Sequence, residues 1–132
     1  MVSSKEMSSN AGCRVSTIEE LKSNEVGFDI GPETSLNFEL MLSKAKTIIW
    51  NGPLGVCEIP SFATGTQYIA SVVRERTKAG AISIISGGDT ASALKNSGIQ
   101  DDFTHISTGG GASLHLLSGR ELPALEALKE YA

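Results

Sequence analysis

Apolar positions along this chain follow two different spacings, one typical of strands and one typical of helices. Short apolar runs bounded by glycine and polar residues predict strands over residues 26–30, 47–50, 81–85 and 105–106. Apolar residues at helical spacing predict helices over residues 34–44, 63–78, 90–96, the segment after 113, and 122–131. Repeated alternation of strand and helix is typical of a parallel sheet with helices on both faces. We therefore expect an α/β protein with three layers, α/β/α.

Two glycine-rich turns follow strands at what would be the same edge of this sheet. Residues 86–90 open one predicted helix, and residues 107–113 open another, where Thr108 is a candidate helix cap. Glycine lets the backbone approach a ligand closely, and the free amides of a helix N-terminus attract phosphate. Each turn alone could be a flexible connection. Two of them at the carboxyl ends of strands, where open α/β sheets bind ligands, predict an anion site.

Composition limits the function classes. The chain has 132 residues and 40% apolar content, enough for one domain or part of one. Its net charge of −4 argues against nucleic acid or an anionic membrane as the main partner. Cys13 and Cys57 lack the spacing of a zinc site, and we expect them to be reduced, in the cytoplasm. The sequence predicts neither a membrane span nor a secretory signal, and the polar start, residues 1–10, is expected to be an irregular tail.

Cationic side chains are missing from the proposed ligand edge. No Lys or Arg lies between Lys46 and Arg74, and Lys95 is the only one between residues 79 and 119. Phosphoryl transfer depends on cations that neutralise the developing charge. Either this chain only binds a phosphate, or the cations belong to a part of the protein that lies outside it.

Three segments, taken in order and spacing, resemble the C-terminal part of phosphoglycerate kinase. They are residues 50–56, 87–90 and 105–113, with residues 27–33 and 118–123 as supporting matches. The resemblance implies a partial Rossmann-like sheet and the phosphoglycerate kinase reaction, in which a phosphoryl group moves between 1,3-bisphosphoglycerate and ADP with Mg²⁺ in glycolysis. Residues 1–25 match loosely, residues 26–122 resemble the last part of the nucleotide-binding domain, and residues 123–132 resemble a helix that docks on the absent N-terminal domain. That absent domain would bind the phosphoglycerate.

The resemblance also implies roles for individual residues. It puts the adenine and ribose of ADP or ATP at Gly27, Pro53 and Glu58, and it puts Asn51 on the phosphate side. Asp89 would hold the magnesium ion, Thr90 would meet a phosphate oxygen, and Gly87 and Gly88 would leave room for the nucleotide. The transferring phosphoryl group would face Thr108, Gly109, Gly110 and Gly111.

Simpler roles remain open for some of these residues. Asp89 could be a plain helix N-cap, and Glu58 could be a solvated loop acid. Ser86 stands where the family usually has glycine, which would weaken the site if that position needs a positive φ. For the whole chain, the alternative to the kinase reaction is a non-catalytic nucleotide-binding or interaction module. A Rossmann oxidoreductase is disfavoured, because no G-x-G-x-x-G motif follows an early strand.

Overall fold

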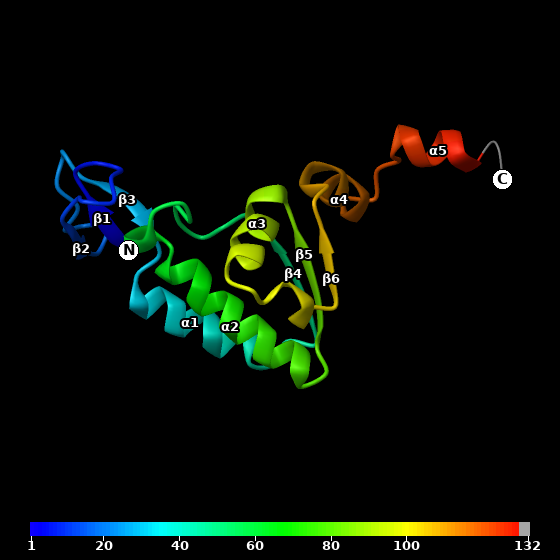
Figure 1. The fold of residues 1–132 in the computed structure, drawn as a ribbon, viewed down its shortest axis with the longest axis horizontal. Helices are drawn as coiled ribbons and strands as arrows, with labels where there is room; N and C mark the ends of the chain where they lie inside the picture. The colour runs from blue at the N-terminus through cyan, green and yellow to red at the C-terminus, as the bar shows by residue number, and fades with distance from the viewer. Residues whose placement is uncertain (130–132) are drawn as a thin grey trace.

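The computed structural model describes residues 1–129, which form two separate three-stranded sheets (Figure 1). The first sheet is antiparallel in the order β2-β1-β3, with β1 (Val2–Ser4), β2 (Cys13–Val15) and β3 (Val26–Asp29). The second is parallel in the order β4-β5-β6, with β4 (Thr47–Asn51), β5 (Ile82–Ser86) and β6 (His105–Ser107). The expected α/β class is confirmed, and the parallel sheet holds the last three predicted strands.

Two expectations for the N-terminal part are wrong. The strand predicted near residues 26–30 does not join the parallel sheet, since β3 pairs antiparallel with β1. The polar start is not an irregular tail, because it supplies β1. Ser3 and Ser4 of this strand are buried and hydrogen-bonded: the hydroxyls of Ser3 and Ser16 lie 2.9 Å apart, and Ser4 Oγ donates to the carbonyl of Gly12 at 3.0 Å. A strand whose inward residues are serines carries no apolar alternation, so the pattern in the sequence missed it.

Five α-helices lie close to their predicted ranges. They are α1 (Pro32–Leu42), α2 (Thr64–Lys78), α3 (Gly88–Asn96), α4 (Gly110–Leu117) and α5 (Pro123–Lys129), with 3₁₀ turns at Pro60–Phe62 and Gln100–Asp102. Helix α2 ends as predicted at Gly80, which has a φ of +94°. The Gly80 amide donates to the carbonyl of Thr77, and the Ala81 amide donates to the carbonyl of Arg76. The terminal helix was predicted to reach residue 131, and its last two residues lie outside the described part.

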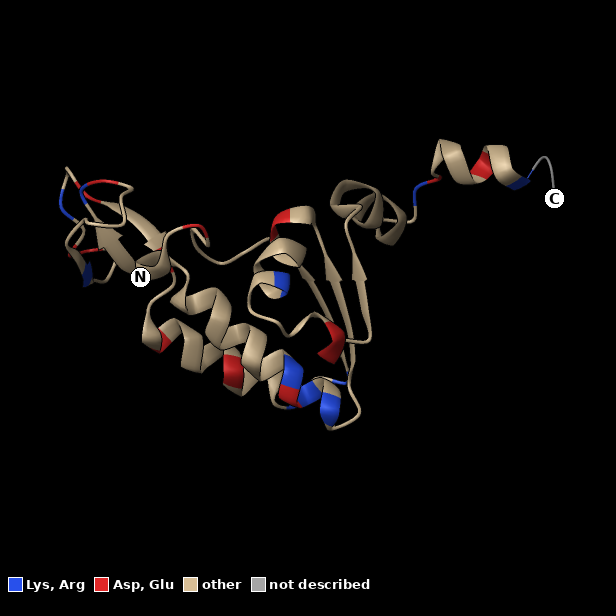
Figure 2. Cartoon of the chain, viewed as in Figure 1, with Lys and Arg blue, Asp and Glu red and all other residues tan. Residues whose placement is uncertain are grey.

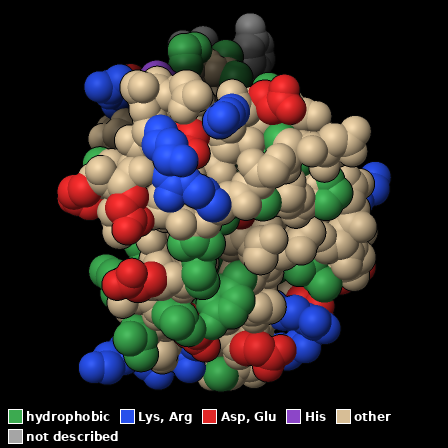
Figure 3. All heavy atoms as spheres, turned by 90° about the vertical axis from the view of Figure 1, so that its left-hand side faces the viewer, with side chains coloured by type: hydrophobic (Ala, Val, Ile, Leu, Met, Phe, Trp, Pro, Cys, Tyr) green, Lys and Arg blue, Asp and Glu red, His purple; other side chains and the backbone are tan. Residues whose placement is uncertain are grey.

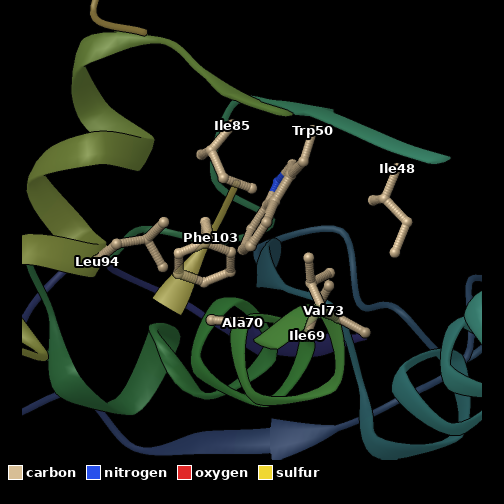
Figure 4. Packing of buried hydrophobic residues seen from close by; sticks show 8 residues of the cluster. All are labelled: Ile48, Trp50, Ile69, Ala70, Val73, Ile85, Leu94 and Phe103. Atoms are coloured by element: carbon tan, nitrogen blue, oxygen red, sulfur yellow. The ribbon is translucent and has the colours of Figure 1, made fainter. Parts of the chain in front are cut away.

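The hydrophobic core fills the space between the parallel sheet and α2 and α3 (Figure 4). Alternate residues of β4 and β5 point into it, which places Ile48, Trp50 and Ile85 against Ile69, Val73 and Leu94. Helix α1 packs on α2, where the hydroxyl of Tyr68 donates a hydrogen bond to Glu39. In Figure 1 α1, α2 and α3 all lie on this side of the parallel sheet. One face of the sheet is therefore fully covered.

The second face of the parallel sheet is largely open within residues 1–129, and α4 lies at its carboxyl end without burying any of its own residues (Figure 1). The Ser107 and Ser113 hydroxyls bond at 3.1 Å and fix α4 there. Further down this face Ile49 and Ile82 are 48% and 51% exposed. The helix layer expected on this face thus consists of α4 alone in residues 1–129.

The outer surface carries further apolar side chains. Figure 3 shows hydrophobic side chains gathered on the face at the left-hand side of Figure 1. On α1, Leu36, Leu40 and Met41 are exposed. Helix α5 extends away from the remaining elements in Figure 1, and its Leu125 and Leu128 are exposed. No helix within residues 1–129 is long and apolar enough to cross a membrane.

Candidate functional site

The two glycine turns predicted to form one site lie against each other. The amide of Gly87 donates to the carbonyl of Ser107 at 3.0 Å, which joins the end of β5 to the end of β6. A Cβ on Gly110 would lie 3.0 Å from Gly87 Cα, tighter than most Cβ contacts in folded proteins. The lack of a side chain at Gly110 therefore serves the packing of the two turns. The predicted meeting of these segments at the carboxyl edge of the sheet is present in the fold.

Asn51 connects both turns to the end of β4. Its Nδ2 donates to Ser86 Oγ and to the carbonyl of Gly110, each at 3.3 Å. The backbone amide of the next residue, Gly52, donates to Thr90 Oγ1 at 3.0 Å. Three strand ends, β4, β5 and β6, are thereby held in one arrangement by side chains of the candidate site itself.

Two glycines of the turns face open space, and a third adopts a backbone conformation that favours glycine. Cβ atoms added to Gly88 and Gly111 would meet nothing within 4 Å, so a ligand could approach their backbone directly. Gly87 has a φ of +100°, a conformation that side chains disfavour. Ser86 is not in this region, because every positive φ in the described chain belongs to glycine. The serine at position 86 therefore introduces no backbone strain, and its buried hydroxyl accepts the hydrogen bond from Asn51.

Asp89 is an exposed carboxylate in the first turn of α3. The N-cap of this helix is Gly87 and no side chain caps it, so the simpler role of Asp89 as a helix N-cap is wrong. Asp89 and Glu58 line one cavity of about 260 Å³, together with Cys57 and Gln67. Within residues 1–129 no cluster of three or more His, Cys, Asp or Glu residues could hold a metal ion. A single carboxylate is sufficient for a magnesium ion whose other ligands are phosphate oxygens and water.

Two threonines occupy positions that differ from the expectation. Thr90 is fully buried, and its hydroxyl accepts the amide of Gly52 instead of facing a ligand surface. Thr108 is exposed and does not cap α4, whose N-cap is Gly109 without a side-chain bond. The neighbouring Ser107 supplies the local bond instead, since its Oγ accepts the Gly109 amide at 3.2 Å. A serine hydroxyl two residues before an amide closes such a turn readily, and this competing geometry displaced the predicted cap.

The remaining predicted residues do not share one cavity. Gly27 lines a cavity of about 610 Å³ with Phe28 and Leu54. The Met1 side chain packs against Gly27, since a Cβ on Gly27 would lie 2.7 Å from Met1 Sδ. Pro53, next to Leu54, is half-buried. Gly88 and Thr108 line a third cavity of about 660 Å³ on the α3 side of β6. Within residues 1–129 the predicted site residues therefore line three separate cavities, of which the Gly88 and Asp89 cavities share Ser92.

Positive charge lies away from the glycine turns. Figure 2 shows Lys and Arg residues gathered near the C-terminal end of α2, at the amino ends of the parallel strands, opposite the edge where α4 begins. Lys95 is the nearest basic side chain in sequence, and it lines the cavity that contains Gly88 and Thr108. The backbone amides at the start of α3 and α4 are the main source of positive potential at the candidate site.

Two buried residues that the sequence reading missed support the loop at residues 51–58. Thr66 Oγ1 accepts the amide of Leu54 at 2.9 Å, and Asp29 Oδ2 accepts the amide of Gly65 at 2.7 Å. Burial raises the pKa of the Asp29 carboxyl, and the amide bonds from Gly65 and Ile30 oppose part of that rise. Burial likewise raises the pKa of the Cys57 thiol, against the effect of a hydrogen bond from Thr66.

Comparison with known proteins gives a consistent result. The family model for phosphoglycerate kinase matches residues 1–120. Phosphoglycerate kinase of Chloroherpeton thalassium is 48% identical over 119 residues, which are 90% of this chain and 30% of that relative. The chloroplastic phosphoglycerate kinase of Volvox carteri is 47% identical over 121 residues, 92% of this chain and 26% of its own length.

Solved structures agree with the sequence matches. The structure of phosphoglycerate kinase from Coxiella burnetii matches with a TM-score of 0.88 and 41% identity, covering 99% of this chain and 33% of that one. The enzyme from Pyrococcus horikoshii matches with a TM-score of 0.69 and 40% identity, covering 77% of this chain and 24% of that one. The chain thus spans about a third or less of the relatives that it matches, and by sequence and by fold it belongs to the phosphoglycerate kinase family.

Proposed function

We propose that this chain supplies the nucleotide-binding part of a phosphoglycerate kinase, which transfers a phosphoryl group between 1,3-bisphosphoglycerate and ADP. The observation that carries the proposal is the meeting of two glycine turns at one sheet edge, bridged by Asn51. Gly88 and Gly111 leave the backbone open there, at the starts of α3 and α4. Backbone amides at helix N-termini bind phosphate without requiring a basic side chain.

Asp89 and Glu58 suit two different parts of a magnesium nucleotide. The exposed Asp89 carboxylate beside Gly88 would hold the Mg²⁺, which in turn neutralises phosphate charge when bound. Glu58 lines the same cavity and could accept hydrogen bonds from the two ribose hydroxyls. Gly27 would contact the base from a second cavity, where Leu54 supplies apolar surface, and Pro53 would contact the base from its place next to Leu54. Gly109, Gly110, Gly111 and Thr108 would lie on the side of the transferring phosphoryl group.

The phosphoglycerate would bind outside this chain, in the part that only the longer relatives contain. The lack of Lys and Arg along the glycine turns supports this division, since the transferred group needs cations that residues 86–90 and 107–113 do not supply. The same lack favours the alternative of a non-catalytic nucleotide-binding module for the chain by itself. Both cysteines are free thiols, which fits our proposal of a reducing, cytoplasmic location.

Titration of the chain with MgADP tests the nucleotide proposal. A side chain at Gly88 has room in the folded protein, so Gly88→Leu should preserve the melting temperature while it fills the space proposed for the nucleotide. We expect this variant to lose MgADP binding. Gly12→Leu is the matched control, because Gly12 is equally open but lies in the hairpin between β1 and β2. No MgADP binding by the wild-type chain, or equal binding by both variants, would contradict the proposal.

A further inference from the structure

The loop at residues 51–58 is held almost entirely by other elements. Three alternate amides point to three different partners: Gly52 donates to Thr90 of α3 at 3.0 Å, Leu54 donates to Thr66 of α2 at 2.9 Å, and Val56 donates to the carbonyl of Phe28 in β3 at 3.0 Å. The loop itself has no strand or α-helix between β4 and the 3₁₀ turn at Pro60–Phe62. Its conformation therefore depends on side chains outside it.

Thr66 is the central one of these supports. Its side chain is 2% exposed, so no water replaces its hydroxyl as the partner of the Leu54 amide. The nearby Cys57 thiol donates instead to the Gly55 carbonyl, inside the loop itself. Thr66 thus supports the loop at Leu54, directly after Pro53 and four residues before Glu58.

The first turn of α2, which carries Thr66, is itself fixed to β3. Asp29 Oδ2 accepts the Gly65 amide at 2.7 Å, and a Cβ on Gly65 would lie 2.3 Å from Ile30 Cγ1. A Cβ on Gly55 would lie 2.3 Å from Asp29 Oδ1, so the loop packs on the same carboxylate. The chain of contacts runs from β3 through Asp29 to α2, and from Thr66 to the loop.

We propose that Thr66 is a positioning residue for nucleotide binding, acting through the Leu54 amide to hold Pro53 and Glu58 in place. The proposal rests on the nucleotide-binding function proposed above. A buried amide that loses its partner drives the backbone toward water and into several conformations. Binding would then have to order the loop, and the affinity for the nucleotide would fall. Thr66 touches no ligand in this arrangement, because its side chain lies beneath the loop.

Three substitutions separate this role from simple stabilisation. Thr66→Val keeps the shape and removes the hydroxyl, Thr66→Ser restores the hydroxyl, and Thr64→Val is the matched control in the same helical turn, where Thr64 is exposed. Hydrogen exchange at the Leu54 amide reports the loop, and MgADP titration reports the site, both measured well below each variant's melting temperature. For Thr66→Val we expect about tenfold faster exchange at Leu54 and about fivefold weaker MgADP binding. Thr66→Ser should return both values to within about twofold of the wild type, as should Thr64→Val.

Several results would overturn the proposal. Unchanged Leu54 exchange in Thr66→Val, or faster exchange with wild-type MgADP affinity, would show that Thr66 only stabilises the fold. If Thr66→Val does not fold, hydrogen exchange at the Leu54 amide is measured in the wild-type chain instead. Exchange as fast as in an unstructured peptide would exclude the hydrogen bond to Thr66 and overturn the proposal. Absence of MgADP binding by the wild-type chain would contradict the proposed function, while the exchange comparison would still decide whether Thr66 orders the loop.

Discussion

Glycines at the carboxyl edge of the parallel sheet fall into two groups according to the space around them. Gly110 packs its bare Cα side against Gly87, so a Cβ there would force the Gly87 backbone to shift. Gly88 and Gly111 meet nothing, so the fold would accept a side chain at either position. A glycine that folding does not require, at an edge suited to phosphate, is more informative about function than one that packing explains.

Alanine at positions 110 and 111 should therefore have opposite consequences. Gly110→Ala forces its Cβ against the Gly87 backbone and should lower the free energy of unfolding by about 1–3 kcal/mol. Gly111→Ala, inside α4, should be neutral or stabilising by up to about 1 kcal/mol, because alanine favours the helix. Urea unfolding followed by Trp50 fluorescence measures both. Equal destabilisation would mean that Gly111 is also needed for packing.

Gly111→Ala also tests whether the Gly111 backbone faces the bound nucleotide. If the Gly111 backbone faces the phosphoryl group, the added methyl group should weaken MgADP binding even though the fold is unchanged. A variant that binds MgADP like the wild type would place the phosphates elsewhere.

Asp89→Asn should separate the metal from the nucleotide. The Asp89 carboxylate repels free polyphosphate but attracts a magnesium complex, so Mg²⁺ changes the effect of Asp89 on nucleotide binding from unfavourable to favourable. We expect MgADP binding to weaken by about 1–2 kcal/mol, which is about 5- to 30-fold, while metal-free ADP binds as well as before or better. Titrations with and without Mg²⁺ measure the two cases. An equal loss in both would show that Asp89 acts without the metal.

Among the elements, the antiparallel sheet at the N-terminus has its own electrostatic support. Arg14 of β2 forms a two-point ion pair with Glu25, just before β3, with a shortest distance of 2.7 Å. The hydrogen bond from Arg14 lowers the pKa of the Glu25 carboxyl to about 2. The Lys22 amide donates to the same carboxylate. These bonds connect β2 to the segment that leads into β3 and so to Gly27.

The pairing of Glu25 should make this sheet sensitive to acid. A carboxyl whose pKa is lower in the folded state stabilises the fold fully above its unfolded pKa, near 4.5. The stabilisation that Glu25 provides is lost as the pH falls from about 4.5 toward 2. Hydrogen exchange of the β1 and β3 amides between these pH values, corrected for intrinsic rates, should show loss of protection in the wild type. Glu25→Gln should be less protected at pH 6 and should change less with pH; a parallel decline in both proteins would assign the acid sensitivity to other groups.

At the scale of the whole molecule, the distribution of charge sets what the chain can do by itself. The glycine turns provide amides and helix dipoles, each contributing only about 0.3–2 kcal/mol toward a bound anion. Lysines and arginines gather at the opposite end of the sheet (Figure 2). This arrangement suits weak, magnesium-dependent nucleotide binding and leaves the charge of a transferring phosphoryl group without a cationic partner.

We therefore expect the 132-residue chain to have no measurable kinase turnover. A coupled assay of phosphoglycerate-dependent ATP consumption measures it, with a mock purification as the control. Turnover clearly above the mock preparation would contradict this prediction. Addition of a separately expressed N-terminal part of a family member tests whether activity returns when the missing cations are supplied.

The sequence by itself determined the parallel sheet and the meeting of the glycine turns. Residues 47–51, 82–86 and 105–107 are apolar runs that end at glycine or polar turns, and strand pairing of this kind leaves the turns at one edge. The glycine at position 80 likewise fixed the end of α2. These features depend on residues close together in the chain, where composition and spacing act directly.

Only the tertiary structure decided which distant segments support the site. The pairing of β3 with β1 depends on buried serines that no apolar pattern reveals. The contact of Thr66 with the Leu54 amide, and that of Asp29 with Gly65, join residues 12 and 36 positions apart. The free energy of such a bond depends on burial, since a hydroxyl or carboxylate that accepts an amide contributes more where water cannot replace it. Burial is a property of the packed molecule, and for that reason Thr66 and Asp29 became visible only in the fold.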